Sequence, residues 1–461
     1  MKTKKINYVY KTEPYDHQKD VLEVSWAARY WALFLEMGTG KSKIICDTIG
    51  MLYERKEINA VLILAPKGVF DNWVKGEIPT HLPDRIERNV LRWTPSKTKA
   101  FQEKLRAITY EDSEDLKIFV MNIEAFSSAR GTKAAQTFLN SNPDNIVVVD
   151  ESTTIKNRKA ARTKNIVDLE ELSKYRRILT GSPVTKSPMD LFSQCLFLSP
   201  RALGFNSFFA FQGRYAMVQR RTMGHRSFQE IVGYRRLDEL NEKLLTFSSR
   251  ILKEDCLDLP PRIYVRREVE LTDEQAKLYT QMKRLALAQL NNGELATTSS
   301  VLTQIMRLQQ ICCGFLQPDE GPIEPLPNNR LSGLMSAIDE TQGKVIIWAS
   351  YTYDIQRITS ALRDRFGPEA VATYYGATPQ DERQDIIEKF QDVNSELRFF
   401  VGQPKTGGFG ITLHAASTMI YFSNSYDLEI RLQSESRAHR INQTKSVTYI
   451  DLVSPNTIDE K

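Results

Sequence analysis

Short apolar runs alternate with longer amphipathic stretches along the chain, in two separate series. The first series covers residues 32–35, 61–65, 118–121, 146–149 and 178–180, and the second covers residues 345–349, 371–374, 399–401, 419–422 and 447–452. Runs of branched residues without polar alternation, such as Ile146-Val147-Val148-Val149, are typical of strands that are buried on both faces. Strands separated by helical stretches predict parallel sheets built from βαβ units. We therefore predict an α/β protein with two parallel-sheet lobes.

Residues 201–330 carry none of these apolar runs. They hold aromatic, basic and helix-like patterns, with turn-rich breaks at Leu259-Pro260-Pro261 and at residues 321–329. We predict a helical insertion and linker here. The chain then divides into a first lobe at 1–200, the insertion and linker at 201–330 and a second lobe at 331–461.

The composition excludes several protein classes. Charged residues are 26% and hydrophobic residues 41% of the 461 residues, which fits neither a disordered chain nor a membrane protein. The basic N-terminus does not lead into the apolar segment of a secretory signal. We expect an intracellular protein, cytoplasmic or nucleoid-associated, or nuclear in a eukaryote, with no membrane partner. The five cysteines form no C-x-x-C pair, so we expect reduced thiols and no zinc site.

The net charge of +5 is concentrated in one place. Residues 211–236 hold one acid, Glu230, against six arginines: Arg214, Arg220, Arg221, Arg226, Arg235 and Arg236. Clustered arginines among aromatic residues indicate nucleic-acid binding. A solvated basic helical hairpin explains the same pattern equally well, and the sequence leaves both interpretations open.

The segment from Ala32 to Ser42 predicts a phosphate-binding loop. An apolar strand is followed by Gly38-Thr39-Gly40-Lys41-Ser42 and then by helical spacing. Such glycines let backbone N–H groups surround a phosphate, the lysine reaches the outer phosphates, and the serine hydroxyl ligates Mg²⁺. The strict G-x-x-x-x-G-K-[ST] pattern requires glycine where this chain has Leu35. A lone G-x-G-K is more often a surface turn, but here the order of strand, turn and helix favours phosphate.

A second candidate site follows residues 146–149. Asp150-Glu151 would lie at the carboxyl end of a buried parallel strand, where such sheets bind ligands. We predict that Asp150 holds Mg²⁺ through water and that Glu151 orients and deprotonates the attacking water. The alternative is an acidic turn that caps the next helix.

Taken together, the motifs resemble the Swi/Snf family of superfamily-two, DNA-dependent ATPases and double-stranded DNA translocases. The resemblance covers nearly the whole chain in motif order. The matching segments are Pro14-Tyr15-Asp16-His17-Gln18, Leu64-Ala65-Pro66 through Trp73, Asp150-Glu151-Ser152 with Ile155-Lys156-Asn157, Leu179-Thr180-Gly181-Ser182-Pro183, residues 250–261, residues 308–312, Gly407-Gly408-Phe409-Gly410-Ile411-Thr412-Leu413, and residues 433–443.

The resemblance implies two RecA-like lobes, ATP and Mg²⁺ as cofactors, and double-stranded DNA as partner, with single-stranded DNA or RNA as alternatives. The catalytic roles fall on Lys41, Asp150, Glu151, Arg437 and Arg440, the last two as arginine fingers. Nucleotide contacts fall on Gln18, Gly38, Thr39, Gly40, Lys41, Ser42 and Gly410, and metal contacts on Ser42 and Asp150. Coupling falls on Thr180, Ser182 and Gln433. Nucleic-acid contacts fall on Lys67, Gly407, Gly408 and Thr412, to which the basic segment adds Arg220, Arg221 and Arg226.

The chain departs from the family pattern in three places. Thr153 stands where the family usually has His, and Asn442 where it has Gly. The chain stops at residues 458–461, where family members usually continue into further helix, so we expect a continuation there. We see no accessory chromatin domain, as in a compact member of the family.

The resemblance favours one function among three. The leading function is ATP hydrolysis coupled to translocation on duplex DNA without strand separation, which makes the protein a helicase-like hydrolase. A strand-separating DNA or RNA helicase shares every ATP motif. A non-hydrolysing, ATP-gated nucleic-acid clamp is the least favoured, because all the catalytic residues are present: Lys41, Asp150, Glu151, Arg437 and Arg440.

Overall fold

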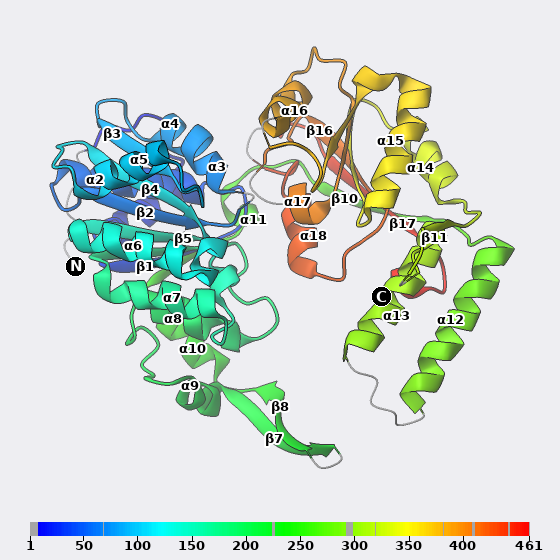
Figure 1. The fold of residues 1–461 in the computed structure, drawn as a ribbon, viewed down its shortest axis with the longest axis horizontal. Coiled ribbons are helices and arrows are strands. Elements are labelled where there is room, and N and C mark those ends of the chain that lie inside the picture. Colours follow the sequence, from blue (N-terminus) through cyan, green and yellow to red (C-terminus); the bar gives the residue numbers. More distant parts are fainter. Residues whose placement is uncertain are drawn as a thin grey trace. The chain divides into compact units, whose positions relative to one another are not determined.

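The protein forms two compact units (Figure 1). The computed structural model describes residues 8–67, 69–223, 226–291, 298–318, 320–380, 382–407, 411–440 and 443–460. Unit 1 is Met1–Leu257 and unit 2 is Asp258–Lys461. The division into segments at residues 200 and 330 stays a prediction.

Unit 1 is built on a seven-stranded parallel sheet in the order β3-β4-β2-β5-β6-β1-β9. Its strands are β1 (Tyr30–Leu35), β2 (Ala60–Ala65), β3 (Arg88–Arg92), β4 (Leu116–Asn122), β5 (Asn145–Asp150), β6 (Tyr175–Leu179) and β9 (Ser248–Ile251). Its helices are α1 (Asp16–Ser25), α2 (Lys41–Glu54), α3 (Phe70–Asn72), α4 (Ile78–His81), α5 (Lys99–Tyr110), α6 (Ala129–Ser141), α7 (Ala161–Val167), α8 (Leu191–Leu198), α9 (Phe208–Tyr215), α10 (Leu237–Leu245) and α11 (Lys253–Cys256).

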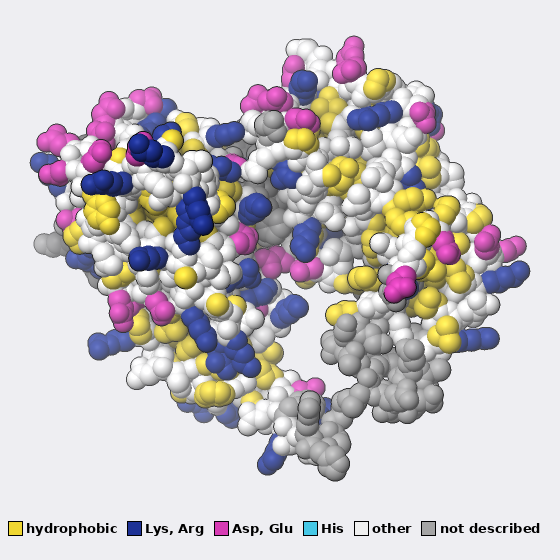
Figure 2. Space-filling view, in the orientation of Figure 1, with side chains coloured by type: hydrophobic (Ala, Val, Ile, Leu, Met, Phe, Trp, Pro, Cys, Tyr) yellow, Lys and Arg dark blue, Asp and Glu magenta, His cyan; other side chains and the backbone are white. Residues whose placement is uncertain are grey.

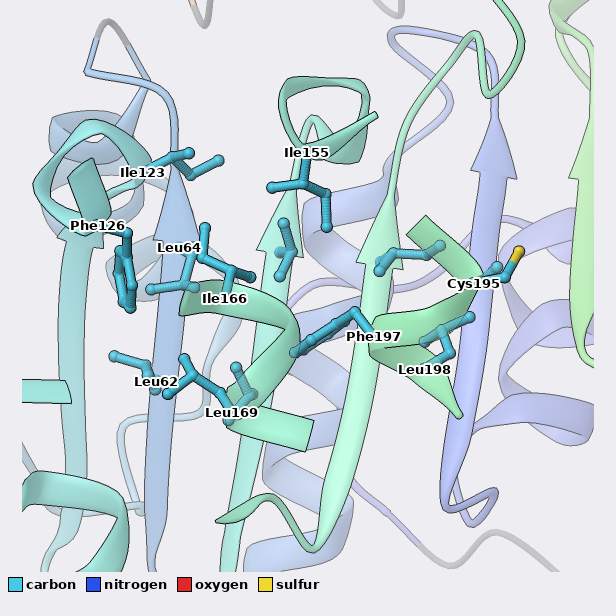
Figure 3. Close-up of a cluster of buried hydrophobic side chains, with 14 of the residues drawn as sticks. Leu62, Leu64, Ile123, Phe126, Ile155, Ile166, Leu169, Cys195, Phe197 and Leu198 are labelled. Carbon is cyan, nitrogen blue, oxygen red and sulfur yellow. The ribbon is translucent and has the colours of Figure 1, made fainter. Parts of the chain in front are cut away.

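Alternate residues of the strands in unit 1 pack on opposite faces of the sheet. Leu62 and Leu64 of β2 belong to a buried cluster with Ile166 of α7 and Phe197 of α8 (Figure 3). Because side chains alternate along a strand, Val61 and Ile63 face the other side, and they are equally buried. Both faces of the sheet are therefore covered, which explains why these strands are apolar throughout.

Unit 2 is built on a six-stranded parallel sheet in the order β10-β17-β16-β13-β15-β14. Its strands are β10 (Arg262–Glu268), β13 (Lys344–Trp348), β14 (Val371–Tyr374), β15 (Phe399–Gly402), β16 (Ala416–Tyr421) and β17 (Val447–Val453), and β11 (Phe315–Leu316) pairs with β12 (Glu324–Pro325) outside this sheet. Its helices are α12 (Asp273–Asn291), α13 (Thr298–Cys313), α14 (Arg330–Asp339), α15 (Thr352–Phe366), α16 (Glu382–Gln391), α17 (Pro404–Gly407) and α18 (Leu428–Glu435).

The sheet of unit 2 also has two buried faces. Val345 and Ile347 of β13 pack in one cluster with helices α14 and α15, whereas Ile346 and Trp348 pack in another with Phe390 of α16. The predicted fold class, α/β with two parallel-sheet lobes, is confirmed.

The expectation that residues 201–330 lack strands is wrong. Helices α12 and α13 agree with the predicted insertion, but β9 joins the sheet of unit 1 and β10 joins that of unit 2. Moreover, β7 (Ala216–Met223) and β8 (Arg226–Tyr234) form an antiparallel hairpin that leaves the body of unit 1 beside α9 (Figure 1). These strands are short or rich in arginine, so they lack the apolar runs that revealed the others.

Within the described residues, no helix combines the length and the apolar character that a bilayer crossing requires.

Candidate nucleotide site and nucleic-acid surface

The loop after β1 has the backbone of a phosphate-binding loop. Gly38 and Gly40 have φ of 84° and 90°, the left-handed region that favours glycine. A Cβ atom on Gly40 would lie 2.1 Å from Nε2 of Gln18. Gly40 immediately precedes α2, so the loop ends at the N-terminus of a 14-residue helix, where backbone N–H groups and the helix dipole favour an anion.

Two side chains of α1 hold this loop from the side. Gln18 Nε2 donates to the Thr39 carbonyl at 3.1 Å, and Nε2 of His17 lies 2.9 Å from the same oxygen. The Oε1 atom of Gln18 accepts the backbone N–H of Tyr15 at 3.0 Å. The sequence predicted Gln18 at the nucleotide site but did not single out His17, whose partner lies 22 residues away.

Lys41 lies across the loop. Its Nζ donates to the carbonyl oxygen of Leu35 at 3.0 Å and approaches that of Glu36 at 3.5 Å. Leu35 stands where the strict motif has glycine, but Lys41 contacts only the backbone carbonyl of this residue. The substitution therefore does not prevent Lys41 from packing against the loop. Ser42 is half-buried in the first turn of α2.

The carboxylates of the second motif lie at the carboxyl end of β5. Asp150 Oδ2 accepts the indole N–H of Trp73 at 2.9 Å, and Oδ1 accepts the backbone N–H of Glu151 at 2.9 Å. Glu151 has φ 49° and ψ 59°, a left-handed conformation that costs a non-glycine residue roughly 1–2 kcal/mol. Such strain in a turn is typical of functional sites.

The turn after β5 is tied to the segment after β6. Ser152 Oγ donates to Oε1 of Gln194 at 2.7 Å, and Gln194 Nε2 donates to the Pro183 carbonyl at 2.9 Å. Both Ser152 and Gln194 are fully buried. Gln194 was not predicted, because a glutamine inside an apolar helix carries no motif. Thr153, the departure from the family pattern, is buried beside them.

The predicted coupling residues of unit 1 lie next to the loop. Thr180 Oγ1 accepts the backbone N–H of Ser182 at 3.2 Å. Between them, a Cβ on Gly181 would lie 3.3 Å from the backbone nitrogen of Met37. Arg250 Nη1 donates to the carbonyls of Phe34 and Gly181, both at 2.9 Å, and so joins the ends of β1 and β6.

Unit 1 thus gathers its predicted nucleotide, metal and catalytic residues at the carboxyl ends of neighbouring strands. The strand order places β6 between β5 and β1, and neighbouring strands lie about 4.8 Å apart. The end of β5 and the loop after β1 are therefore separated by roughly 10 Å. Ser42 and Asp150 offer a hydroxyl and a carboxylate, the oxygen donors that Mg²⁺ prefers, so the donor set fits this ion.

In unit 2 the two predicted arginines share a partner. Arg437 Nη1 donates to the Ile411 carbonyl at 3.1 Å, and Arg440 Nη1 approaches it at 3.4 Å. Arg440 also donates to Oγ1 of Thr412 at 2.6 Å. Arg437 is only 7% exposed, whereas Arg440 is half-buried.

The remaining predicted residues of unit 2 differ in their surroundings. Gln433 is fully buried, and within the described part of the chain neither polar atom of its side-chain amide has a hydrogen-bond partner. A Cβ on Gly407 would lie 2.8 Å from the ring of Trp348, so this position has room only for glycine. Gly408, Gly410 and Asn442 lie outside the described residues.

The basic segment forms part of the hairpin, and some of its charge is paired. Arg221 forms an ion pair with Glu230 across the strands, and Arg214 pairs with Glu239 of α10. The hydrogen bond from Arg214 lowers the pKa of Glu239 to about 2. Arg220 donates to Oγ of Ser227 at 3.0 Å and remains exposed. The backbone of Arg226 starts β8.

Figure 2 shows Lys and Arg side chains on the visible face of unit 1 over α8, α9 and α10, near the start of the hairpin. Lys67, the other predicted nucleic-acid contact of unit 1, is exposed after β2. Among the described residues, no hydrogen bond or ion pair joins the Lys67 side chain to the hairpin or to the phosphate loop.

Comparison with known proteins decides the family. Residues 17–315 match the SNF2-related domain, and residues 329–442 match the helicase conserved C-terminal domain. The chain belongs to the SNF2-related family. The predicted resemblance is therefore confirmed, and so is the predicted enzyme class at family level, that of helicase-like ATPases.

Several curated relatives of this SNF2-related chain share about a quarter of its residues. It is 26% identical over 447 residues to the SWI/SNF chromatin-remodeling complex subunit snf22 of Schizosaccharomyces pombe, covering 92% of the chain and 25% of that protein. It is 26% identical over 431 residues to the uncharacterized ATP-dependent helicase MG018 of Mycoplasma genitalium (92% and 38%). It is 25% identical over 454 residues to the putative ATP-dependent helicase/translocase YwqA of Bacillus subtilis (94% and 46%).

The chain thus spans between a quarter and just under half the length of these relatives. Among solved structures, the Sulfolobus solfataricus SWI2/SNF2 ATPase core in complex with dsDNA is similar, with 23% identity, a TM-score of 0.44, and coverage of 98% of this chain and 90% of that one.

Proposed function

We propose that this SNF2-related chain hydrolyses ATP and couples the hydrolysis to translocation along double-stranded DNA, without obligatory strand separation. The observation that carries the proposal is the edge of the sheet in unit 1. Three neighbouring strands of that sheet, β1, β6 and β5, end there. They are followed by the glycine loop with Lys41, by the Thr180–Ser182 turn and by the carboxylates of Asp150 and Glu151.

In the proposed reaction, the loop and Lys41 bind the phosphates of ATP. The Nζ group of Lys41 has three donors and lies against two carbonyl oxygens, which a bound phosphate would partly replace. Glu151 orients the attacking water and accepts its proton. Ser42 and Asp150 would hold Mg²⁺, partly through water, and the ion would neutralise charge on the phosphates.

In the proposal, unit 2 stabilises the negative charge that develops on the phosphates in the transition state. Arg440 and Arg437 would act as arginine fingers, because a guanidinium keeps its charge and spreads over several phosphate oxygens. This role requires the two units to close around ATP. Repeated closing and opening would shift the DNA contacts of the two units stepwise along the backbone. Lys67, Gly407 and Thr412 would be among these contacts.

A strand-separating helicase is the second candidate, because two of the relatives are named ATP-dependent helicases. It uses the same ATP site, so ATPase motifs do not distinguish it from a translocase. The distinction lies in whether the strands of a duplex come apart during turnover.

The experiment compares ATPase rates of the full chain with duplex DNA, single-stranded DNA and RNA, beside a strand-separation assay on a forked duplex. We expect the greatest stimulation by duplex DNA and no release of strands. Release of strands at the rate of ATP turnover would instead support the helicase, and the absence of ATPase activity with every nucleic acid would contradict both candidates.

The matched variant is Glu151→Gln, which keeps the size of the side chain but removes the base. We expect ATP binding within about threefold of the wild type and hydrolysis slower by roughly 10²–10⁴-fold, the usual contribution of a general base. Binding is measured with a fluorescent ATP analogue and turnover by phosphate release. Turnover like that of the wild type would show that Glu151 is not the base.

A further inference from the structure

Trp73 makes one hydrogen bond to the carboxylate that is proposed to hold Mg²⁺. Its side chain is completely buried, and its Nε1 donates to Oδ2 of Asp150 at 2.9 Å. The other oxygen, Oδ1, accepts the backbone N–H of Glu151 at 2.9 Å. Each oxygen of the carboxylate therefore accepts a hydrogen bond, and these two bonds orient its plane.

The backbone around Trp73 is built to hold the indole in place. Trp73–Glu77 is a π-helical turn between α3 and α4, a rare form that is frequent at functional sites. Asn72 Nδ2 donates to Oε1 of Glu77 at 2.9 Å across this turn. A Cβ on Gly76 would lie 2.7 Å from Oδ1 of Asn72, so the Asn72–Glu77 hydrogen bond depends on glycine at this position.

The chemistry of the indole suits this role. An indole N–H is a neutral group that only donates, so it orients the carboxylate and leaves its negative charge available to a cation. A lysine or arginine in the same place would hold the carboxylate as firmly but would cancel that charge. Mg²⁺ demands near-octahedral geometry, so the direction of each ligand oxygen matters.

We propose that Trp73 is a positioning residue, which orients Asp150 for Mg²⁺. This inference rests on the proposed function, in which Asp150 is a metal ligand. Partners that orient metal ligands typically contribute 10–100-fold to metal affinity or activity.

A spectroscopic test follows Trp73 directly. The full chain, which contains five tryptophans, is labelled with fluorotryptophan, and its ¹⁹F resonances are assigned by single Trp→Phe substitutions. Mg²⁺ is then titrated in the presence of saturating ADP. We expect the Trp73 resonance to shift with Mg²⁺ more than those of Trp31 and Trp93. A Trp73 resonance that does not respond, while Mg²⁺ raises the affinity for ADP, would overturn the proposal.

A kinetic test compares Trp73→Phe with Trp31→Phe. Trp31 lies in the same unit and donates its indole N–H to Oγ of Ser249 at 3.0 Å, so its variant also loses one indole hydrogen bond. We expect Trp73→Phe alone to raise the Mg²⁺ concentration for half-maximal ATPase by roughly 10–100-fold, with KM for ATP at saturating Mg²⁺ within about threefold. Equal Mg²⁺ requirements in both variants, beside an equal loss of Tm, would assign Trp73 a purely structural role.

The two tests separate this inference from the proposed function. If Trp73→Phe does not fold, the Trp73 resonance is still identified by elimination from the other four variants. If the wild type shows no ATPase activity with any nucleic acid, the proposed function fails, whereas a response of the Trp73 resonance to Mg²⁺ with ADP still supports the positioning role.

Discussion

Gly40 shows how a single residue sets the geometry of the phosphate loop. A residue with a side chain would be strained at this φ of 90°. Its Cβ would also displace the amide of Gln18, which donates a hydrogen bond to the Thr39 carbonyl. The glycine spacing was readable in the sequence because it is local. The contact with Gln18 was not readable, because only the fold brings α1 to the loop.

Two further residues illustrate the same limit. Trp73 and Gln194 both hold the turn after β5, yet they lie 77 and 42 residues from their partners along the chain. Trp73 belongs to a family motif, and its hydrogen bond could not be inferred from that motif. Residue types therefore predicted the chemistry of the site, whereas its supporting contacts required the structure.

A pH-dependent pair lies inside α2. Asp47 is fully buried and bonded to Lys43 at 2.5 Å. Burial raises the pKa of Asp47 from 3.8 to about 6, although the hydrogen bond from Lys43 opposes the shift. Between these two values the folded state binds a proton that the unfolded state does not, so Asp47 favours folding more strongly as the pH falls.

We therefore expect the wild type to gain stability relative to Asp47→Asn as the pH falls from 7 to 4. A shift of about two pKa units corresponds to about 3 kcal/mol. The measurement is urea unfolding of both proteins across this range, followed on unit 1. A difference in unfolding free energy that stays constant between pH 4 and pH 7 would contradict the prediction.

At the scale of elements, the hairpin was the segment that the sequence predicted least well. Strands that bury one face show apolar residues at every second position, and this pattern identifies them. Gln219, Arg220 and Arg221 of β7 are all exposed, so no face of the hairpin is buried there and no such pattern arises. The ribbon is held instead by its own ladder of backbone hydrogen bonds.

The form of the hairpin is compatible with the nucleic-acid contacts that the sequence predicts for Arg220, Arg221 and Arg226, since a two-stranded ribbon fits the major groove of DNA. Changing Arg220, Arg221 and Arg226 together to Ala should raise the DNA concentration for half-maximal ATPase stimulation. It should also lower the slope of log affinity against log salt by up to about 3, while turnover without DNA stays unchanged. DNA titrations at several salt concentrations measure both effects.

A matched control removes three exposed cations elsewhere in unit 1, by changing Lys97, Lys104 and Arg106 to Ala. This variant loses the same formal charge and should keep the DNA response of the wild type. Equal effects in the two triple variants would mean that only net charge matters. An unaltered DNA response in the hairpin variant would support the alternative interpretation, in which the basic segment is only a solvated face.

At the scale of the whole molecule, each unit has a complete sheet with two covered faces, but neither holds a complete set of the proposed catalytic groups. Lys41, Asp150 and Glu151 belong to unit 1, and Arg437 and Arg440 belong to unit 2. The sequence predicted both sheets because their central strands are apolar. It did not predict the edge strands β3, β9 and β10, each of which contains arginine.

The structure also separates the two arginines that the motif treats alike. Arg437 is buried and bonded to the carbonyls of Gln433 and Ile411. Its removal would take away two buried hydrogen bonds from a charged donor, each worth about 1.5–3 kcal/mol, so Arg437→Ala should lower the stability of unit 2. Arg440 is half-buried, and its variant is the sharper test of the arginine finger.

Arg440→Ala should leave ATP affinity within about threefold, because the loop and Lys41 of unit 1 supply most ground-state contacts. It should lower DNA-stimulated hydrolysis by roughly 10³–10⁵-fold, since a finger acts on charge that develops in the transition state.

The control is Arg383→Ala, which removes a half-buried arginine of unit 2 that donates to the carbonyls of Tyr375 and Thr378. Its turnover should remain close to that of the wild type, and translocation should fail only in the Arg440 variant. Full DNA-stimulated turnover in Arg440→Ala would show that unit 2 does not complete the active site through this residue, and equal losses of ATP binding and turnover would make Arg440 an ordinary binding contact.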